Sequence, residues 1–457
     1  MELKNKRVLV VGLGRSGAAS AIFLQERGAK VTVSDSKSEA QLQNDIPALL
    51  DRGISIEAGR HGERTFRDQD LIVVSPGVPS DQPQLQQARA LGIPVIGEIE
   101  LAFRHLQGKV LAITGSNGKT TTTTLVGEIL SKSGKKTLVG GNIGTPVISL
   151  VNRATAETNL VLEVSSFQLE TIERFRPWIA AILNITPDHL DRHHTFQAYV
   201  DAKARIFENQ QEDDFALLNA DDAACIGLKD RVKGELYWFS RKRPVEQGAF
   251  LKEDQIIFRS SGMDQTVLRR NEIQLKGEHN VENVLAAVAM SMLAGCPREQ
   301  VRRAVMEFRA VEHRLELVTS INGVSFYNDS KATNVDATIK ALESFPGNIH
   351  IILGGKDKGS DYTVLNPLLR ERVKRAYLIG AAAEKIASQI QGAAPLVHSG
   401  TLEHAVRQAF DAARPGDVVV LAPACASFDQ FENYEQRGRI FKELVMSLAP
   451  VPMGDRA

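Results

Sequence analysis

A glycine-rich turn between an apolar run and a helix-forming run constrains the fold most. Residues 110–114 are mostly apolar, Gly115 and Gly118 follow, and Lys119 opens a stretch expected to be helical to about Ser133. This order is typical of a phosphate-binding loop, because glycines let main-chain N–H groups face a polyphosphate and a helix N-terminus adds positive charge. The strict pattern has glycine where this chain has Ile113. A glycine-rich helix cap that binds no ligand is therefore the alternative.

Composition narrows the class of protein. The 457 residues suggest about three domains, and 55 basic residues balance 55 acidic ones, so nothing points to nucleic acid or an anionic membrane. Three distant cysteines indicate reduced thiols, and no signal peptide or apolar run of ~20 residues is found. We expect a cytoplasmic protein without membrane insertion.

The first hundred residues carry a second nucleotide-binding pattern. An apolar strand, Val8–Val11, leads into G-x-G-x-x-G at Gly12–Gly17, and a strand over 30–33 ends at Asp35. This is typical of a Rossmann-like βαβ unit, and the backbone contacts fit NAD or another nucleotide diphosphate equally well. A later strand, 71–75, runs into a turn at Gly77, either a ligand-binding edge or an ordinary turn.

Acidic and histidine side chains follow two further predicted strands. Glu163 lies near the end of Leu160–Val164, and Asp188 and His189 follow the apolar strand Trp178–Ile185. Because parallel strands end at one edge of a sheet, we expect Glu163 and His189 near the phosphate loop, where oxygen ligands suit Mg²⁺. Zinc is disfavoured, since no cysteine is nearby to complete its ligand set. Helix capping is the alternative for Asp188 and His189.

The rest of the middle region gives weaker signals. Lys203 and Arg205 lie on a predicted helix over 195–209 and, from the residues alone, are solvated charges. Short β-like runs follow from 215 to about 275. Polar residues from Gly277 to Asn283 then open an apolar helix, either to bind a nucleoside or to cap it.

The last part of the chain is a separate α/β unit. Asn322-Gly323 predicts a two-residue hairpin turn, and strands then alternate with helices to the strand Val418–Leu421. Three polar segments follow strands and can face one cleft: 329–334, 354–359 and 423–431. Cys425 has no base beside it in sequence, so we interpret it as a small structural residue.

Taken together, these motifs resemble those of the Mur ligases. The similarity rests on segments that occur in order along nearly the whole chain: TGSNGKT, GGNIG, LEVSSFQLE, DHLDR, KGEHNVEN, HRLE, NDSKATN and ACASFDQF. It implies an α/β protein of three domains. These are a Rossmann-like UDP-sugar-binding domain over 1–98, a central ATP-binding domain of the phosphate-loop type over 99–311, and a Rossmann-like domain over 312–457 that binds the amino acid and closes over ATP.

The resemblance also assigns roles to residues. Lys119, His189 and a carbamylated Lys203 would be catalytic, and two Mg²⁺ ions would be held by Thr120, Glu163, His189 and Lys203. The remaining roles form three binding sets. The residues that would bind ATP are Gly115, Ser116, Asn117, Gly118, Lys119, Thr120, Thr121, Asn280, His313, Arg314, Asp329 and Lys331. Those that would bind the UDP-sugar are Ser16, Ser36, Lys37, Gly77, Asn142 and His189. Those that would bind D-glutamate are Lys358, Thr333, Ser427 and Tyr434. Phenylalanine is expected at position 434, so the Tyr434 hydroxyl needs a partner if buried.

The implied activity is ATP-driven amide formation in peptidoglycan synthesis. D-glutamate would be joined to UDP-N-acetylmuramoyl-L-alanine through an acyl phosphate. We expect a monomer with no nucleic-acid partner. Three alternatives stay open: another Mur or folylpolyglutamate-type ligase, an NAD-dependent oxidoreductase using Gly12–Gly17, and a non-catalytic phosphate-loop binding module.

Overall fold

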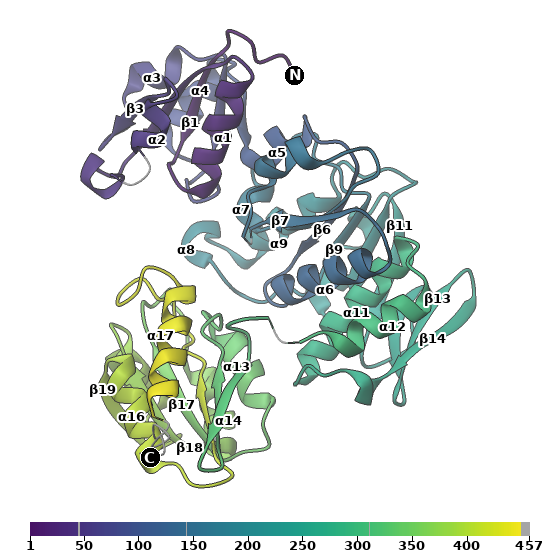
Figure 1. The fold of residues 1–457 in the computed structure, drawn as a ribbon, viewed down its shortest axis with the longest axis vertical. Helices are drawn as coiled ribbons and strands as arrows, with labels where there is room; N and C mark the ends of the chain where they lie inside the picture. Colours follow the sequence, from purple (N-terminus) through teal and green to yellow (C-terminus); the bar gives the residue numbers. More distant parts are fainter. Residues whose placement is uncertain (44–45, 143, 310, 449–457) are drawn as a thin grey trace, which may run out of the picture. The chain divides into compact units, whose positions relative to one another are not determined.

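The computed structural model describes residues 1–43, 46–142, 144–309 and 311–448 (Figure 1). Strands and helices alternate around three separate sheets, so the predicted α/β class is confirmed. The chain divides into two compact units: residues 1–187, 192–272 and 283–306 form the first, and residues 188–191, 273–282 and 307–457 form the second. The domain boundaries at 98 and 311 stay predictions, and the last residues of the third range, 449–457, lie outside the described part.

The first sheet has five parallel strands in the order β3-β2-β1-β4-β5. Its β1 and β4 strands are nearly continuous apolar runs because helices cover both faces, as parallel sheets require. The elements are β1 Arg7–Val11, α1 Arg15–Glu26, β2 Lys30–Asp35, α2 Ile46–Leu50, β3 Ser55–Ala58, α3 Glu63–Arg67, β4 Leu71–Val74, α4 Pro83–Ala90, β5 Val95–Gly97 and α5 Glu98–Phe103.

The second sheet has nine strands in the order β14-β13-β12-β11-β10-β9-β6-β8-β7. The apolar strand β9 lies between β6 and β10, as predicted for a central strand, and the sheet becomes antiparallel only from β12 to β14. The elements are β6 Lys109–Thr114, α6 Lys119–Lys132, β7 Thr137–Gly141, η2 Val147–Arg153, β8 Asn159–Glu163, α7 Ser166–Leu169, β9 Ile179–Ile182, α8 Leu190–His193, α9 Phe196–Ala204, η3 Arg205–Phe207, β10 Phe215–Asn219, α10 Ala223–Ile226, β11 Glu235–Ser240, β12 Gly248–Lys252, β13 Gln255–Ser260, β14 Met263–Arg269, α11 Glu278–Leu293 and α12 Arg298–Glu307.

The third sheet has six strands in the order β15-β16-β20-β17-β18-β19. The predicted hairpin is confirmed: Ile321 pairs with Val324, and Asn322 and Gly323 both have positive φ (51° and 78°), as a two-residue turn of this kind needs. The elements are β15 Glu316–Ile321, β16 Val324–Asn328, α13 Val335–Glu343, β17 Ile349–Gly354, α14 Asn366–Arg372, β18 Val373–Ile379, α15 Ala383–Ile390, β19 Leu396–Gly400, α16 Leu402–Ala412, β20 Val418–Leu421 and α17 Tyr434–Ser447.

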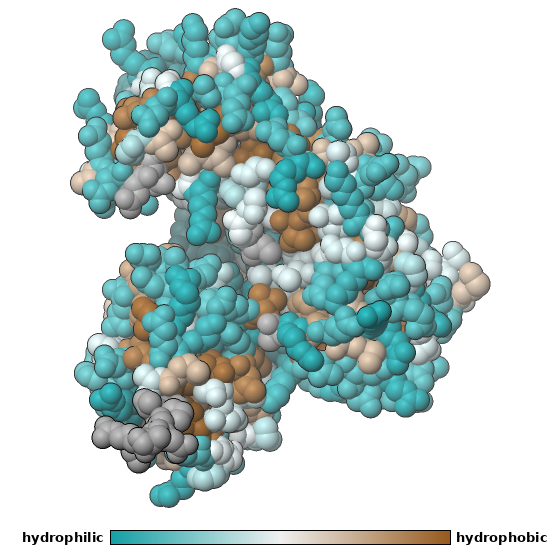
Figure 2. All heavy atoms as spheres, viewed as in Figure 1, coloured by the Kyte–Doolittle hydropathy of each residue, from teal (hydrophilic) through white to brown (hydrophobic). Residues whose placement is uncertain are grey.

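Figure 2 shows one face of the molecule coloured by hydropathy. The face drawn in Figure 2 is mostly hydrophilic, with apolar side chains in smaller groups. Among the described helices, none has the length and apolar character to cross a membrane.

Candidate active site

The phosphate loop has the predicted strand–turn–helix form. Strand β6 ends at Thr114, the loop follows, and α6 begins at Lys119. Gly118 precedes the helix with φ 84°, a conformation that side chains disfavour. A Cβ built on Gly118 would lie 2.1 Å from Asn283 Oδ1, so glycine is required sterically as well. The Asn283 side chain therefore packs directly against the loop backbone at the point where the loop turns into the helix.

Glu163 joins the phosphate loop to two neighbouring segments. It pairs with Ile113 across the sheet, which places its carboxylate beside the start of α6. Thr120 Oγ1 donates to Glu163 Oε2 and Asn142 Nδ2 donates to Glu163 Oε1, each at 2.8 Å. A hydroxyl and a buried carboxylate are hard oxygen donors, so this pair fits a Mg²⁺ ion.

Two lysines donate to one carbonyl of the loop. Lys119 Nζ lies 2.8 Å from Gly115 O and 2.9 Å from Ser116 O, and Lys203 Nζ lies 2.9 Å from the same Gly115 O. Lys203 Nζ also lies 3.4 Å from Thr114 Oγ1 and 4.5 Å above the Tyr199 ring. The loop thus gathers two amines within reach of any polyphosphate that its N–H groups would bind.

The interpretation of Lys203 and Arg205 as solvated charges is wrong. Lys203 is only 1% exposed, and its amine donates to Gly115 O of the phosphate loop. The Arg205 guanidinium donates to the carbonyls of Leu169, Glu170 and Ile172. Both cations therefore have structural partners that the local sequence does not reveal.

Asn184, which received no role from the sequence, supports the loop from the end of β9. Its Oδ1 accepts the Asn117 N–H at 2.8 Å, its Nδ2 donates to Asn117 O, and its carbonyl accepts the Ser116 N–H. Ser116 Oγ also donates to Thr186 O. In the sequence, the Asn-Ile-Thr-Pro run directly after an apolar strand is the only indication of this role. The residues that Asn184 contacts, Asn117 and Ser116, are about 70 residues away in the chain.

In the first sheet, Asp35 supports the glycine-rich turn itself. Asp35 Oδ2 accepts the Leu13 N–H at 2.6 Å and Oδ1 accepts the Lys37 N–H at 2.8 Å. The fingerprint would have this carboxylate bind a ribose. Close packing explains Gly17, where a Cβ would lie 1.9 Å from Gly12 O. Ser16 is half-buried, whereas Ser36, Lys37 and Gly77 are exposed.

Arg192 is a second residue that sequence reasoning missed. Its guanidinium donates to Pro76 O and Val78 O, at 3.0 and 3.1 Å, and pairs with Glu170 at 2.7 Å. These contacts hold the turn that contains Gly77, one of the predicted UDP-sugar residues. The Asp-His-Leu-Asp-Arg motif contained this residue, but only its acidic and histidine members suggested chemistry.

In the second unit, the Arg314 charge acts on Asp329, a residue of the predicted ATP set, and on His279. Desolvation raises the pKa of Asp329 to about 7, while the Arg314 charge and the Leu315 N–H oppose that rise. Burial lowers the pKa of His279 to about 3, and the Lys340 and Arg314 charges act in the same direction. Asn280 Nδ2 donates to Lys276 O at 2.6 Å. The Arg314 charge is therefore close enough to Asp329 and His279 to influence the pKa of both groups.

Tyr434 contacts the predicted ATP residues of this unit. Lys331 Nζ lies 3.7 Å above its ring centroid, and the His313 ring meets it edge-on at 6.2 Å. Its backbone carbonyl accepts from Ser330 Oγ at 2.8 Å. The ring thus supports Lys331 and His313, and the assignment of Tyr434 to D-glutamate stays a prediction.

The segments that carry Lys358 and Ser427 are joined. Lys356 and Ala426 form an antiparallel bridge through two backbone hydrogen bonds of 2.9 and 3.1 Å. Lys358 Nζ lies 3.8 Å from Asp188 Oδ1, and Asn334, next to Thr333, donates to the other oxygen of Asp188 at 3.0 Å. Lys358 is thus paired with a carboxylate in this structure, which is the group that an amino-acid substrate would present.

His189 belongs to the second unit, next to Asp188, with φ 54°. Its N–H donates to Asp188 Oδ1 at 2.9 Å. The predicted approach of His189 to Glu163 and Lys119 stays a prediction.

Cys425 is buried, its Sγ lies 3.0 Å from the Tyr362 hydroxyl, and desolvation raises its pKa to about 11, which supports its interpretation as a structural residue.

Three family models match successive parts of the chain. Residues 6–97 match the Mur ligase MurD-like N-terminal domain, residues 113–291 the Mur ligase middle domain, and residues 313–425 the Mur ligase glutamate ligase domain.

Full-length relatives and solved structures agree with these matches. Proteins named UDP-N-acetylmuramoylalanine--D-glutamate ligase are similar: that of Koribacter versatilis is 65% identical and that of Acidobacterium capsulatum 62% identical, over 98% of this chain and 99% and 97% of theirs. Among solved structures, the MurF ligase of Thermotoga maritima in complex with ADP shares the fold at a TM-score of 0.61 and 18% identity, over 98% of this chain and 97% of its own. The MurC ligase of the same organism has a TM-score of 0.60 at 20% identity, covering 97% and 100%. With its motifs, its three sheets and these matches, the chain belongs to the Mur ligase family.

Proposed function

We propose that this protein catalyses the ATP-dependent addition of D-glutamate to UDP-N-acetylmuramoyl-L-alanine in peptidoglycan synthesis, releasing ADP and phosphate. Relatives of 50–65% identity that span nearly the whole chain carry the name of this ligase. The observation that carries the proposal is the group of Lys119, Thr120, Glu163 and Lys203 around one phosphate loop.

The reaction must bring a carboxylate to a polyanion. The alanyl carboxylate of the sugar nucleotide attacks the γ-phosphorus of ATP, ADP leaves, and an acyl phosphate forms. The amine of D-glutamate then attacks the acyl carbon, loses a proton and expels phosphate. Lys119 and the loop N–H groups lower the repulsion in the first step, because they offer positive charge where negative charge accumulates.

The proposal also includes two Mg²⁺ ions. Thr120 and Glu163 would supply oxygen donors for one Mg²⁺, and His189 and a carbamylated Lys203 would hold the second. Mg²⁺ neutralises phosphate charge when it is bound. A carbamate on the buried Lys203 would keep one N–H that can donate to Gly115 O. It would also add oxygen atoms, which a metal ion can use as ligands and an ammonium lacks.

The three predicted domains divide the substrates among them. Residues 1–98 bind the UDP-sugar through the Gly12–Gly17 turn and the Gly77 turn, residues 99–311 bind ATP, and residues 312–457 bind D-glutamate through Lys358 and Ser427. We propose a monomer that works in the cytoplasm. Closure of the third domain would protect the acyl phosphate from water.

Phosphate release tests the proposal. ATP is supplied with UDP-N-acetylmuramoyl-L-alanine, with D-glutamate, with both, and with L-glutamate in place of D-glutamate. We expect sustained release only with the sugar nucleotide and D-glutamate together. Release that requires a different amine would indicate another ligase of the family, and release without any acceptor would indicate a phosphate-loop hydrolase.

A further inference from the structure

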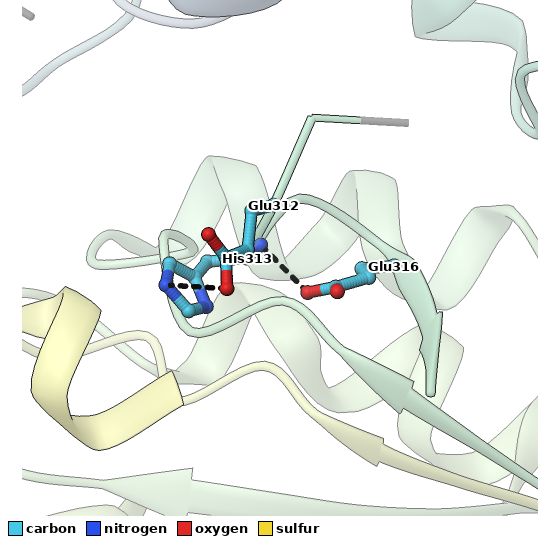
Figure 3. Close-up of side chains that lie close together, drawn as sticks. All are labelled: Glu312, His313 and Glu316. Carbon is cyan, nitrogen blue, oxygen red and sulfur yellow. Dashed lines mark hydrogen bonds and ion pairs between the residues drawn. The ribbon is translucent and has the colours of Figure 1, made fainter. Parts of the chain in front are cut away.

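Arg314 lies in a strained turn of the second unit, and Figure 3 shows that the neighbouring side chains Glu312, His313 and Glu316 lie close together. His313 and Leu315, on either side of it, have φ values of 65° and 45°. Bulky residues rarely adopt this left-handed conformation, and it persists only where the surroundings hold it. The contacts of the neighbouring residues should therefore explain how the strained backbone on either side of Arg314 is held.

Glu316 and Asn328 hold the backbone and ring of His313. Glu316 Oε2 accepts the His313 N–H at 2.9 Å, and Asn328 Nδ2 donates to Glu316 Oε2 at 3.2 Å and to His313 Nδ1 at 2.9 Å. Asn328 Oδ1 accepts the Ser330 N–H, which fixes the orientation of the amide. Nδ1 of His313 is therefore unprotonated, in keeping with its pKa, which burial lowers.

A lysine supplies the positive charge of this cluster. One ligand atom from each of Glu312, His313 and Glu316 lies within 4.8 Å of the others, a spacing that would also suit a metal ion. However, the Lys442 ammonium of α17 donates to Glu312 and, at 3.1 Å, to Glu316. Because Lys442 neutralises both carboxylates and Asn328 already uses Nδ1, the cluster is better explained as an internal support than as a metal site.

Helix α17 also packs against the His313 ring. A Cβ built on Gly438 would lie 2.2 Å from His313 Nδ1, so the ring packs directly on the helix backbone. Asn328 Nδ2 reaches Gly438 O at 3.3 Å. The turn, the hairpin strand β16 and helix α17 therefore form one support next to Arg314, whose charge acts on Asp329 and His279.

We infer that Glu316, together with Asn328 and Lys442, is a positioning residue for nucleotide binding that acts through Arg314. The inference rests on the proposed function, because it takes Arg314 as an ATP contact. It predicts that loss of Glu316 lowers nucleotide affinity only while Arg314 is present.

A double-mutant cycle on the full chain tests this coupling. The affinity for ADP is measured by calorimetry, and KM is measured for ATP and for D-glutamate, in Glu316→Ala, Arg314→Ala and the double variant. We expect Glu316→Ala to weaken ADP binding and raise KM for ATP by about 5-fold or more, and to add less than about 2-fold in the Arg314→Ala background. The KM for D-glutamate should change by less than about 2-fold.

Two further variants separate positioning from general stability. Glu316→Gln keeps an oxygen that can accept the His313 N–H and should restore most of the ADP affinity. Glu312→Gln changes the other, more exposed carboxylate on Lys442 and should leave ADP affinity within about 2-fold. If Glu316→Ala does not fold, Lys442→Met replaces it in the cycle, since it removes the ammonium from the same carboxylate.

The outcomes distinguish this inference from the proposed function. Normal ADP binding with additive effects of Glu316→Ala and Arg314→Ala would overturn the positioning role alone, as would a specific Zn²⁺ or Mg²⁺ site abolished equally by Glu312→Gln and Glu316→Ala. Failure of the native protein to bind ADP would overturn both. Coupled effects on ADP binding in a protein without D-glutamate-dependent phosphate release would support the positioning role and reject the proposed substrates.

Discussion

Lys203 shows what local sequence does not reveal at the scale of a residue. Its neighbours Tyr199, Val200, Ala202 and Ala204 are buried too, so α9 is enclosed on more than one face. A helix buried on one face would leave a lysine at this position in water, and the phosphate-loop carbonyl that receives it is 88 residues away. The role of Lys203 came from resemblance, because no pattern in its own helix predicts burial of a charge.

Replacement of Lys203 by alanine tests the carbamate. We expect Lys203→Ala to lower turnover at least ~10²-fold and to be rescued in part by short carboxylates, because these can return the missing oxygen atoms. Steady-state phosphate release with and without added carboxylate measures both effects. Full activity of the variant in CO₂-free buffer would reject the carbamate.

Lys119 is the second residue whose role is testable alone. Its amine contacts loop carbonyls rather than the core, so Lys119→Ala should fold normally and lose at least ~10²-fold in turnover through lost stabilisation of transferring charge. Lys132→Ala, at the other end of α6, is the matched control and should keep near-native turnover. A near-native rate for Lys119→Ala would remove this amine from the chemistry.

At the scale of elements, patterns that depend on neighbouring residues were confirmed. The β6 strand, its glycine turn and α6, and the Asn322-Gly323 hairpin, all follow from local backbone preferences. The pairing of β12, β13 and β14 was not predicted, because short apolar runs do not encode which strand lies beside which. The contacts that Asn184 makes with Asn117 and Arg192 makes with Pro76 were not predicted for the same reason, since these partners lie 67 and 116 residues away.

Two glycines at opposite ends of α6 offer a matched pair. Gly118 and Gly134 both have positive φ, at 84° and 77°. A Cβ added to Gly118 would clash with the Asn283 side chain, whereas a Cβ added to Gly134 would lie in open space. Gly134→Ala should lower stability by about 1 kcal/mol with normal kinetics. Gly118→Ala should lower stability further and raise KM for ATP at least ~10-fold, because the loop must move away from Asn283.

Thermal melting and steady-state kinetics of the two variants make the comparison. Equal melting temperatures and equal KM values for ATP would show that the Asn283 contact does not constrain the loop.

At the scale of the whole molecule, Glu98 ties α5 to η2 within the first unit. Its Oε1 accepts the Ile148 N–H at 2.7 Å, and burial raises its pKa from 4.5 to about 7. Between these values the folded protein holds a proton that the unfolded chain has released. The Glu98 contribution to stability therefore falls as pH rises through this window and stays low above it.

Glu98→Gln should remove that pH-dependent penalty. Relative to the native protein, the variant should gain roughly 1 to 3 kcal/mol of stability between pH 5 and pH 8, because the amide is neutral throughout. Thermal unfolding at the two pH values measures the gain, and Glu157→Gln, an exposed carboxyl of the same unit, is the control. The same stability difference at both pH values would contradict the assignment.

The three native thiols have a practical consequence for studies of domain motion. Cys225, Cys296 and Cys425 are buried, and desolvation raises the pKa of each, so little reactive thiolate is available near neutral pH. A spectroscopic label should therefore attach selectively to cysteines introduced at exposed positions such as Gln211 and Glu403, one in each unit, without first replacing the native thiols. Distances between such labels would follow any closure driven by nucleotide and substrate in the otherwise unaltered enzyme.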